Sequence, residues 1–208
     1  MKIVVVGHGM VGHRFVEVLA RDTATAHLET PIDVTVLCEE NLPAYDRVQL
    51  SSYFSGKTAD DLSLVAPNFF EDNGFKLHLG QGVAEIDRVA KTVTTTSGEK
   101  LSYDKLVLAT GSYPFVPPLA GKDRSDCLVY RTIDDLEAMK VSAARSKIGV
   151  VVGGGLLGLE AAKALRDLGL ETHVVEFAPR LMAVQIDDGA GKILRNKIES
   201  LGVWHSFG

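Results

Sequence analysis

The sequence holds 208 residues, of which 27 are acidic and 22 basic, giving a net charge of −5. Hydrophobic residues make up 46% and charged residues 24%, as in soluble globular proteins, so a largely disordered chain is excluded. The acidic balance argues against a nucleic-acid binder, and no apolar run approaches the roughly 18 residues of a membrane span. We therefore expect a cytoplasmic protein with neither a membrane nor a nucleic-acid partner.

The cysteines and histidines show no metal-binding spacing. Cys38 and Cys127 lie far apart with no C-x-x-C pair, so neither a disulfide framework nor a zinc or iron–sulfur site is indicated. Each cysteine is interpreted as a small buried hydrophobe. We expect no metal site, and the sequence identifies no catalytic acid, base or nucleophile.

The N-terminal residues follow the order of a dinucleotide-binding unit. The apolar run Lys2–Val6 predicts a strand buried in a parallel sheet, and a G-x-G-x-x-G motif over residues 7–12 follows it directly. A helical periodicity comes next. Its predicted apolar face consists of Val11, Phe15, Val18 and Leu19. A second apolar strand, Val34–Leu37, then precedes the acidic Glu39, which completes the order expected of a nucleotide-binding βαβ unit.

Each residue of the glycine motif has its own predicted task. Gly7 permits a tight turn, Gly9 lets the backbone approach a pyrophosphate, and Gly12 lets the helix pack closely on the strand. The phosphates would bind the unpaired amides at the start of the helix, at Met10 and Val11.

Two details of this unit depart from the simplest pattern. The interval from Gly7 to Glu39 is longer than the usual twenty or so residues, which we attribute to a polar surface loop at Thr23–Asp33. His8 stands at a variable position of the motif and is interpreted as an ordinary turn residue rather than a participant in chemistry.

The middle of the chain predicts a small meander, a strand and a linker. Three short segments with strand-like alternation predict the antiparallel meander: 82–87, 92–96 and 100–103. The next segment, Lys105–Gly111, predicts a buried strand that ends in a Thr-Gly pair. Prolines at positions 114, 117 and 118 indicate a linker, and Asp134–Arg145 predicts a short helix.

The nucleotide-binding pattern recurs after this helix. A predicted strand, Ile148–Val152, leads into a second glycine motif over residues 153–158 and a helix at Leu159–Leu168. The following strand, Thr172–Val175, ends at Glu176, at the usual distance from the motif. Two such units in one chain indicate a reaction between two nucleotides.

The predicted fold class is therefore α/β, with two Rossmann-like dinucleotide-binding units and a small antiparallel β-meander. We expect three parts in the chain: a first nucleotide-binding domain at 1–112, a linker with a short helix at 113–146, and a second nucleotide-binding domain at 147–208.

Four longer runs carry a family resemblance: residues 42–54, 110–114, 130–136 and 176–182. With the two glycine motifs, these runs resemble the flavoprotein pyridine-nucleotide oxidoreductases with two dinucleotide-binding domains. The most similar subfamily is the N-terminal flavin portion of the large subunit of NAD(P)H-dependent nitrite reductase. The resemblance implies FAD in the first domain and NAD(P)H in the second, which is inserted into the first.

The resemblance also implies roles for individual residues. Around FAD, Glu39 would hold the adenosine ribose, Arg47 the pyrophosphate and Ala84 the adenine through its backbone. Arg131 would approach the cofactor from the linker. The strand end that lies against FAD is Ala109, Thr110 and Gly111. The NAD(P)H site would consist of Gly153, Gly155, Leu156, Leu157, Gly158 and Glu176.

These roles predict transfer of hydride from NAD(P)H to FAD, as the electron-input part of a nitrite reductase. NADH is favoured because Glu176 would repel a 2′-phosphate, although Arg180 lies close in sequence. The electron acceptor would be sirohaem with an iron–sulfur cluster, which this cysteine-poor chain cannot hold itself. The resemblance is compatible with a homodimer.

Two alternatives remain open. One is an NADH-dependent reductase of a small iron–sulfur or rubredoxin-type partner, although members of that type carry a lysine where this chain has Ser52. The other is a truncated, non-catalytic nucleotide-binding fragment. The resemblance implies a C-terminal Gly-Asp segment beyond residue 208 that closes the FAD site, so we expect an incomplete module. Residues 204–208 alternate poorly for a strand.

Overall fold

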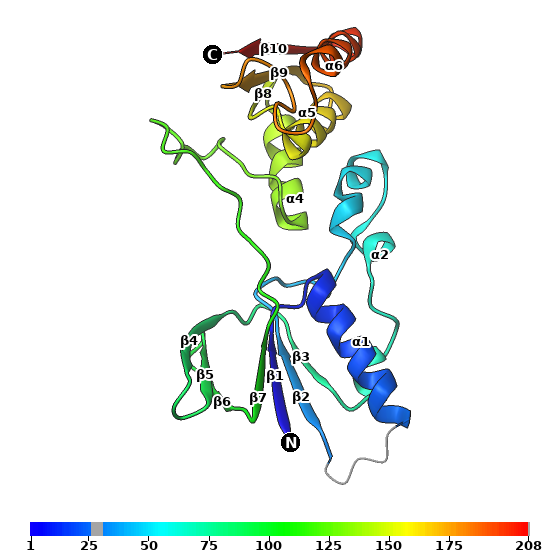
Figure 1. Cartoon of the computed structure of the whole chain (residues 1–208), viewed down its shortest axis with the longest axis vertical. Coiled ribbons are helices and arrows are strands. Elements are labelled where there is room, and N and C mark those ends of the chain that lie inside the picture. Colours follow the sequence, from blue (N-terminus) through cyan, green and yellow to red (C-terminus); the bar gives the residue numbers. More distant parts are fainter. Residues whose placement is uncertain (26–30, 208) are drawn as a thin grey trace. The chain divides into compact units, whose positions relative to one another are not determined.

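The computed structural model describes residues 1–25 and 31–207, which form two compact units (Figure 1). The first unit comprises Met1–Arg47 and Ala59–Tyr113. The second comprises Val48–Thr58 and Pro114–Gly208. A short segment from the first half of the chain therefore belongs to the second unit.

The first unit is built on a four-stranded parallel sheet in the order β3-β2-β1-β7. Its strands are β1 (Lys2–Val6), β2 (Asp33–Leu37), β3 (Lys76–His78) and β7 (Lys105–Leu108). Val4 lies opposite Thr35 of β2 and Leu106 of β7, so β1 is a central strand with neighbours on both sides. This position explains its unbroken apolar sequence, because both of its faces are buried.

Helix α1 (Met10–Thr25) covers one face of this sheet. Its buried face carries His13, Val16 and Ala20, and Val11 is 74% exposed. The face predicted from Val11, Phe15, Val18 and Leu19 is therefore wrong by part of a turn, although Phe15 and Leu19 still pack at its edge. The reason is that the helix meets the sheet through Gly12, which turns positions 13, 16 and 20 inward. The loop predicted at Thr23–Asp33 overlaps the end of α1, and its residues 26–30 lie outside the described residues.

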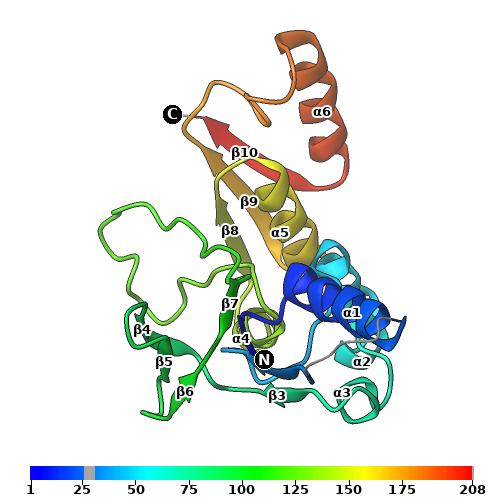
Figure 2. The same ribbon diagram turned by 60° about the horizontal axis from the view of Figure 1, so that its bottom comes forward.

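The antiparallel meander packs on the other face of the sheet (Figure 2). It consists of β4 (Val83–Asp87), β5 (Thr92–Thr95) and β6 (Lys100–Ser102), in the order β4-β5-β6. Val93 of β5 is fully buried against Val4, Val6 and Leu37. Short helices complete this part of the chain: η1 (Arg47–Ser55), α2 (Ala59–Leu62) and α3 (Phe69–Asp72).

The second unit contains a three-stranded parallel sheet in the order β10-β9-β8. Its strands are β8 (Ile148–Val152), β9 (Glu171–Glu176) and β10 (Val203–Phe207). Its helices are α4 (Ile133–Ala143), α5 (Leu156–Asp167) and α6 (Asp188–Ser200). Ala162, Val174, Leu181 and Val203 form the core. The expectation that the last residues would not form a strand is wrong, because β10 pairs with β9 along its whole length.

Helix η1 belongs to the second unit through its contacts with α4. The Tyr53 hydroxyl donates a hydrogen bond to the Glu137 carboxylate, and the Lys140 ammonium lies 3.8 Å from the centroid of the Tyr53 ring. Tyr53 thus meets a hydrogen-bond acceptor and a cation on one helix face.

The two units confirm the predicted α/β class with parallel sheets and one antiparallel meander. Among the described residues, no helix combines the length and apolarity that crossing a membrane requires.

Candidate nucleotide-binding sites

The first glycine turn joins β1 to α1 and needs glycine at two of its positions. Gly7 has φ +100°, and a Cβ there would lie 2.2 Å from the carbonyl oxygen of Ala109. A Cβ at Gly12 would lie 2.1 Å from the carbonyl oxygen of Gly7. Both clashes are with backbone atoms, which cannot move aside as a flexible side chain can. The turn is therefore packed tightly on the end of β7 and on the first turn of α1.

Gly9 differs from these two glycines because the space where its Cβ would lie is open. A Cβ built there would meet only the Arg47 Nε among described atoms, at 4.0 Å. The next residues, Met10 and Val11, begin α1 and are 37% and 74% exposed. The first amides of a helix have no partner within the helix and carry its positive dipole end. An anionic group can therefore approach the backbone at this place.

Arg47 lies beside this opening and is already paired. Its guanidinium forms an ion pair with Glu40 and lies 4.9 Å from the centroid of the Tyr45 ring. The Tyr45 hydroxyl donates a 2.6 Å hydrogen bond to the same Glu40 carboxylate. These contacts fix a planar donor fork next to Gly9, a geometry that suits phosphate oxygens.

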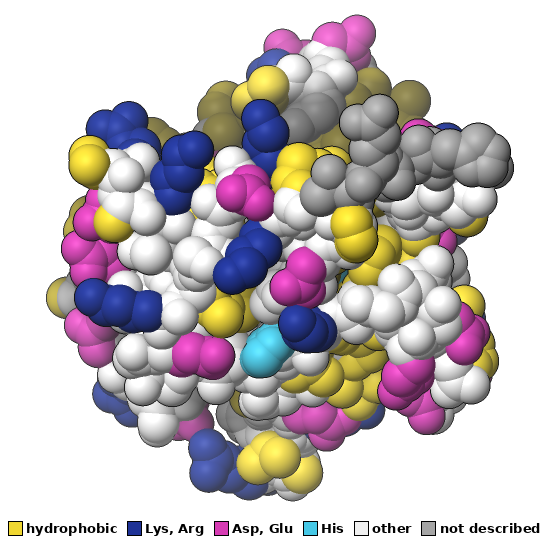
Figure 3. All heavy atoms as spheres, turned by 90° about the horizontal axis from the view of Figure 1, so that it is seen from below, with side chains coloured by type: hydrophobic (Ala, Val, Ile, Leu, Met, Phe, Trp, Pro, Cys, Tyr) yellow, Lys and Arg dark blue, Asp and Glu magenta, His cyan; other side chains and the backbone are white. Residues whose placement is uncertain are grey.

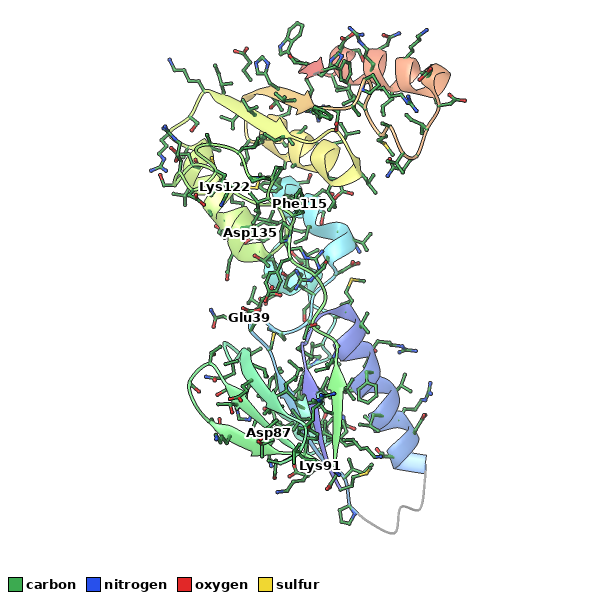
Figure 4. The ribbon with its side chains drawn as sticks, turned by 60° about the vertical axis from the view of Figure 1, so that its left-hand side comes forward. Glu39, Asp87, Lys91, Phe115, Lys122 and Asp135 are labelled. Carbon is green, nitrogen blue, oxygen red and sulfur yellow. The ribbon has the colours of Figure 1, made fainter. Side chains whose placement is uncertain are left out.

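Glu39 follows the carboxyl end of β2 (Figure 4), where ligands of parallel sheets bind. Its Oε2 accepts a 2.6 Å hydrogen bond from the hydroxyl of Tyr113, and this bond raises the pKa of Tyr113. A Cβ at Gly82 would lie 3.7 Å from Glu39 Cγ. The acid and the start of the meander are thus close together.

Ala84 occupies an irregular position in the meander. Val83 pairs with Thr95 and Glu85 pairs with Thr94, so the β4–β5 register skips Ala84. Such a bulge leaves the backbone groups of its extra residue out of the ladder and commonly occurs beside binding sites. The backbone groups of Ala84 therefore lie outside the β4–β5 ladder.

The end of β7 closes the first turn from the other side. The Ala109 amide donates a 2.7 Å hydrogen bond to the Val6 carbonyl, and the Ala109 carbonyl faces Gly7. Thr110 and Gly111 follow, and Gly111 has φ +68°. Gly7, Gly9, Met10, Val11, Gly12, Glu39, Arg47, Ala84, Ala109, Thr110 and Gly111 all belong to the first unit.

Arg131 belongs to the second unit and directly precedes the N-cap of α4. Thr132 caps the helix by accepting from the Asp135 amide at 3.2 Å. The Asp135 carboxylate accepts in return from the amides of Thr132, at 2.8 Å, and Arg131, at 3.1 Å. This capping box fixes the backbone at Arg131.

The second glycine turn repeats the geometry of the first. Gly153 has φ +110°, and a Cβ at Gly158 would lie 1.9 Å from the Gly153 carbonyl oxygen. Gly155 is the N-cap of α5, and a Cβ there would meet no described heavy atom within 4 Å. Leu156 and Leu157, which begin α5, are each 58% exposed. This turn also has one open glycine directly before exposed residues at the start of a helix.

Glu176 stands at the end of β9 and holds the second turn in place. Its carboxylate accepts from the Ala178 amide at 2.7 Å and from the Gly154 amide at 2.5 Å. The hydrogen bond from the Ala178 amide has the largest effect and that from the Gly154 amide adds to it, and together they hold the pKa of Glu176 below its usual value. The carboxylate is therefore negatively charged at neutral pH.

Two histidines behind the first turn are buried together, a pairing that the sequence interpretation missed. His8 is 3% exposed and His13 is 2% exposed, and their Nε2 and Nδ1 atoms are 3.3 Å apart. Burial, and then the neighbouring His13, lower the pKa of His8 to about 4. His8 lies in the turn, as interpreted from the sequence, but it is buried and hydrogen-bonded there. The sequence signal that could have indicated this pair is the spacing of His8 in the turn and His13 in the first turns of α1.

The two cysteines differ in their surroundings. Cys38 is buried, but Cys127 is exposed, so its interpretation as a buried hydrophobe is wrong. Within the described residues, no three His, Cys, Asp or Glu side chains form a group able to hold a metal ion.

A hollow of about 320 Å³ at the amino ends of β1, β2 and β3 is lined by residues of both charges, including Lys2, Asp33 and Lys76. Figure 3 shows Lys and Arg interspersed with Asp and Glu when the molecule is seen from below. None of the predicted nucleotide-binding residues lines this hollow. Its position differs from the carboxyl ends of the strands, where parallel sheets bind ligands.

Comparisons with known proteins agree with the two-turn architecture. The nitrite reductase (NADH) large subunit of Escherichia coli strain K12 is 54% identical over 203 residues, covering 98% of this chain and 24% of that protein. The NAD(P)H nitrite reductase large subunit of Klebsiella oxytoca is 55% identical over 202 residues, covering 97% of this chain and 21% of that protein. The chain thus spans about a quarter or less of the length of these relatives.

A solved structure of an oxidoreductase has a similar fold. The NADH:rubredoxin oxidoreductase from Clostridium acetobutylicum matches with a TM-score of 0.83 and 27% identity, covering 99% of this chain and 52% of that chain. A family model described as pyridine nucleotide-disulphide oxidoreductase matches residues 1–208. The resemblance drawn from the sequence motifs is confirmed, and the chain belongs to the pyridine nucleotide-disulphide oxidoreductase family.

Proposed function

We propose that this chain is the NAD(P)H-to-FAD electron-input module of a nitrite reductase. The observation that carries the proposal is the pair of glycine turns, each with one open glycine, Gly9 or Gly155, directly before the exposed first residues of a helix. Each turn also has an acid after the next strand, Glu39 or Glu176. The identity of 54–55% to two nitrite reductase large subunits supports the activity class.

The first unit would hold FAD and the second NAD(P)H. The cradle at Gly9 fits a pyrophosphate because its backbone is open and the Arg47 guanidinium lies beside it. Glu39 would bind the ribose hydroxyls and the bulged backbone at Ala84 the adenine. The domain parts at 1–112, 113–146 and 147–208 remain our proposed assignment, with Arg131 reaching FAD from the linker.

Bound FAD would supply the chemistry, accepting hydride from NAD(P)H and passing the electrons onward. The residues of the chain would bind and orient the two nucleotides, so no acid, base or nucleophile of the protein is required. The acceptor beyond FAD would be a sirohaem and iron–sulfur centre outside these 208 residues, because such clusters need several cysteine ligands and this sequence contains two cysteines.

NADH is the preferred donor in this proposal. The Glu176 carboxylate would accept hydrogen bonds from ribose hydroxyls and repel a 2′-phosphate. Arg180, the cation near Glu176 in sequence, forms a 2.8 Å ion pair with Asp188 and donates to the Ile186 and Ala183 carbonyls. We expect Glu176→Gln to raise the rate with NADPH relative to NADH, measured as reduction of bound flavin.

The second candidate is an NADH-dependent reductase of a small rubredoxin-type or iron–sulfur partner. The observation in its favour is the 0.83 TM-score match to the NADH:rubredoxin oxidoreductase, at half the sequence identity found for the nitrite reductases. Ser52 favours the first proposal, because it replaces the lysine that the resemblance assigns to ferredoxin-reductase-type members.

Titration of the protein with FAD, followed by quenching of flavin fluorescence, tests the proposal. Anaerobic NADH should then bleach the visible absorbance of the bound flavin. Gly9→Ala should weaken FAD binding about tenfold or more, corresponding to about 1.4 kcal/mol. Gly155→Ala should leave FAD binding unchanged and slow the bleaching.

The two glycine variants control for each other, because the methyl group that each adds would point into open space. Binding of FAD without bleaching by NADH in the wild type would support a non-catalytic nucleotide-binding fragment. Loss of FAD binding in Gly155→Ala with no effect of Gly9→Ala would contradict the assignment of the two sites.

A further inference from the structure

A continuous chain of hydrogen bonds runs through the two histidines behind the first glycine turn. The Ala44 amide donates to His8 Nδ1 at 3.2 Å. His8 Nε2 lies 3.3 Å from His13 Nδ1, and His13 Nε2 lies 3.0 Å from the Leu64 carbonyl oxygen. The chain therefore joins four places that are distant in sequence or separated by a turn: the glycine turn, α1, the loop after β2 and the residues after α2.

The partners at the two ends fix the protons of both rings. A backbone amide can only donate, so His8 Nδ1 must be the accepting nitrogen and the proton of the neutral ring is on Nε2. That proton is donated to His13 Nδ1, which places the His13 proton on Nε2, facing the Leu64 carbonyl. The hydrogen bonds thus assign the Nε2–H tautomer to both rings.

The surroundings of the pair are mainly aromatic. Phe70 packs edge-on against His8, with ring centroids 5.2 Å apart, and Phe69 packs against His13 at 5.4 Å. The charged and titratable groups beside the pair are Glu17, whose Oε1 lies 3.7 Å from His13 Nε2, and the buried thiol of Cys38. A mainly apolar wall makes the loss of either hydrogen bond costly, because no water replaces the missing partner.

The anchored loop carries residues of the proposed FAD site. Ala44 stands between Glu39 and Arg47, and its carbonyl accepts from the Leu64 amide at 2.9 Å. The loop is therefore held from two sides, by the residues after α2 and by His8 in the glycine turn. The hydrogen bond from Ala44 to His8 links this loop directly to the glycine turn, and Arg47 of the loop lies beside Gly9 of that turn.

We propose that His8 is a positioning residue of the first nucleotide site, which, with its ring oriented by His13, holds the 42–47 loop and its Arg47 against the glycine turn. The proposal rests on the proposed function for the identity of the nucleotide, FAD. The anchoring itself is a property of the nucleotide-free chain and is measured separately.

The decisive comparison is His8→Asn with His8→Leu in the full chain. The Oδ1 of asparagine occupies about the place of His8 Nδ1 and can accept from the Ala44 amide, whereas leucine fills the space without an acceptor. We expect FAD affinity to fall about fivefold or more in His8→Leu and to remain within about twofold of wild type in His8→Asn. His173→Leu, on β9 of the second unit, is the matched control and should leave FAD affinity unchanged.

Amide hydrogen exchange reports the anchoring without any nucleotide. Exchange at Ala44 should accelerate about fivefold or more in His8→Leu and stay near the wild-type rate in His8→Asn. If wild type fails to bind FAD, the proposed function is wrong while this contrast still tests the anchoring. Equal Ala44 exchange in wild type and His8→Leu would overturn the positioning role, as would equal FAD affinity in a chain that binds FAD.

Nitrogen NMR of the wild-type histidine rings covers the case in which His8→Leu does not fold. The proposal requires both rings as Nε2–H tautomers and a coupling across the hydrogen bond from the Ala44 amide to His8 Nδ1. An Nδ1–H tautomer at His8 would overturn it, because that ring could not accept from Ala44.

Discussion

The glycines of the first turn separate into two physical classes, which predicts opposite effects of the same substitution. Gly12→Ala would bring a Cβ within 2.1 Å of a backbone oxygen, whereas the Cβ of Gly9→Ala would meet, among the described atoms, only the Arg47 Nε at 4.0 Å. We expect Gly12→Ala to lower the free energy of unfolding by about 1–3 kcal/mol, as overpacking does. Gly9→Ala should change it by no more than about 0.5 kcal/mol.

Urea denaturation followed by circular dichroism measures both values without a nucleotide. Gly9→Ala serves as the control for a methyl group added to the same turn. A loss of stability in Gly9→Ala as large as that in Gly12→Ala would show that the opening at Gly9 is required by the fold and is not a ligand-binding feature.

His8 predicts a dependence of stability on pH. Its pKa is lowered from 6.5 to about 4 in the folded chain, so between these values the unfolded chain binds more protons. The free energy of unfolding therefore falls as the pH decreases through this window. We expect His8 to contribute about 2 kcal/mol to the loss between pH 7 and pH 5.

Denaturation curves at several pH values check this contribution. His8→Asn should lose correspondingly less stability between pH 7 and pH 5 than wild type, whatever its stability at pH 7. An unchanged slope in His8→Asn would mean that another group controls the acid sensitivity.

At the scale of elements, the sequence predicted those whose signal is local. The strands β1, β2 and β8 are apolar runs next to glycine turns or acids, and the meander alternates between turn residues. The three-residue β3 and the irregular β10 carry too little periodicity to be recognised, and their pairing with β2 and β9 comes from the sheet. Tertiary packing, not propensity, decides such edge strands.

The site residues also divide into those that the local sequence predicts and those that only tertiary packing brings together. The glycine turns and the strand-end acids follow from motif and order, so they could be found without coordinates. The contacts of Glu39 with Tyr113, of Arg47 with Glu40 and of His8 with Ala44 join residues that no spacing rule connects. The rotation of α1 that buries His13 in place of Val11 also depends on the contact at Gly12.

The capping box of α4 gives a prediction for one element. The Thr132 side chain accepts from the Asp135 amide, and Asp135 in turn holds the amides of Thr132 and Arg131. Thr132→Ala should destabilise the second unit by about 1 kcal/mol, because an orphan amide at the helix start loses its acceptor. Thr132→Ser retains the hydroxyl and should restore most of this loss in chemical denaturation. Equal losses in both variants would indicate that the threonine methyl, rather than the cap, stabilises this end of α4.

At the scale of the whole molecule, each unit has its own hydrophobic core. Val36 is fully buried in the core of the first unit and Val174 in that of the second, and both are 0% exposed. Units with separate cores unfold as separate cooperative transitions unless a large interface couples them. The segment Val48–Thr58 belongs to the second unit although its flanking residues belong to the first, so it connects the two units covalently at both of its ends.

This organisation predicts two resolvable thermal transitions in scanning calorimetry of the nucleotide-free protein. Val36→Ala and Val174→Ala remove matched side chains from fully buried positions, and each should cost about 2 kcal/mol in its own unit. Val36→Ala should therefore lower one transition temperature and Val174→Ala the other. Added FAD should raise mainly the transition that responds to Val36→Ala, and added NADH mainly the transition that responds to Val174→Ala, because a ligand stabilises most the unit that supplies most of its contacts. If both substitutions instead lower one common transition by similar amounts, the two units form a single cooperative structure, and the separate nucleotide-binding stabilities proposed for them are wrong.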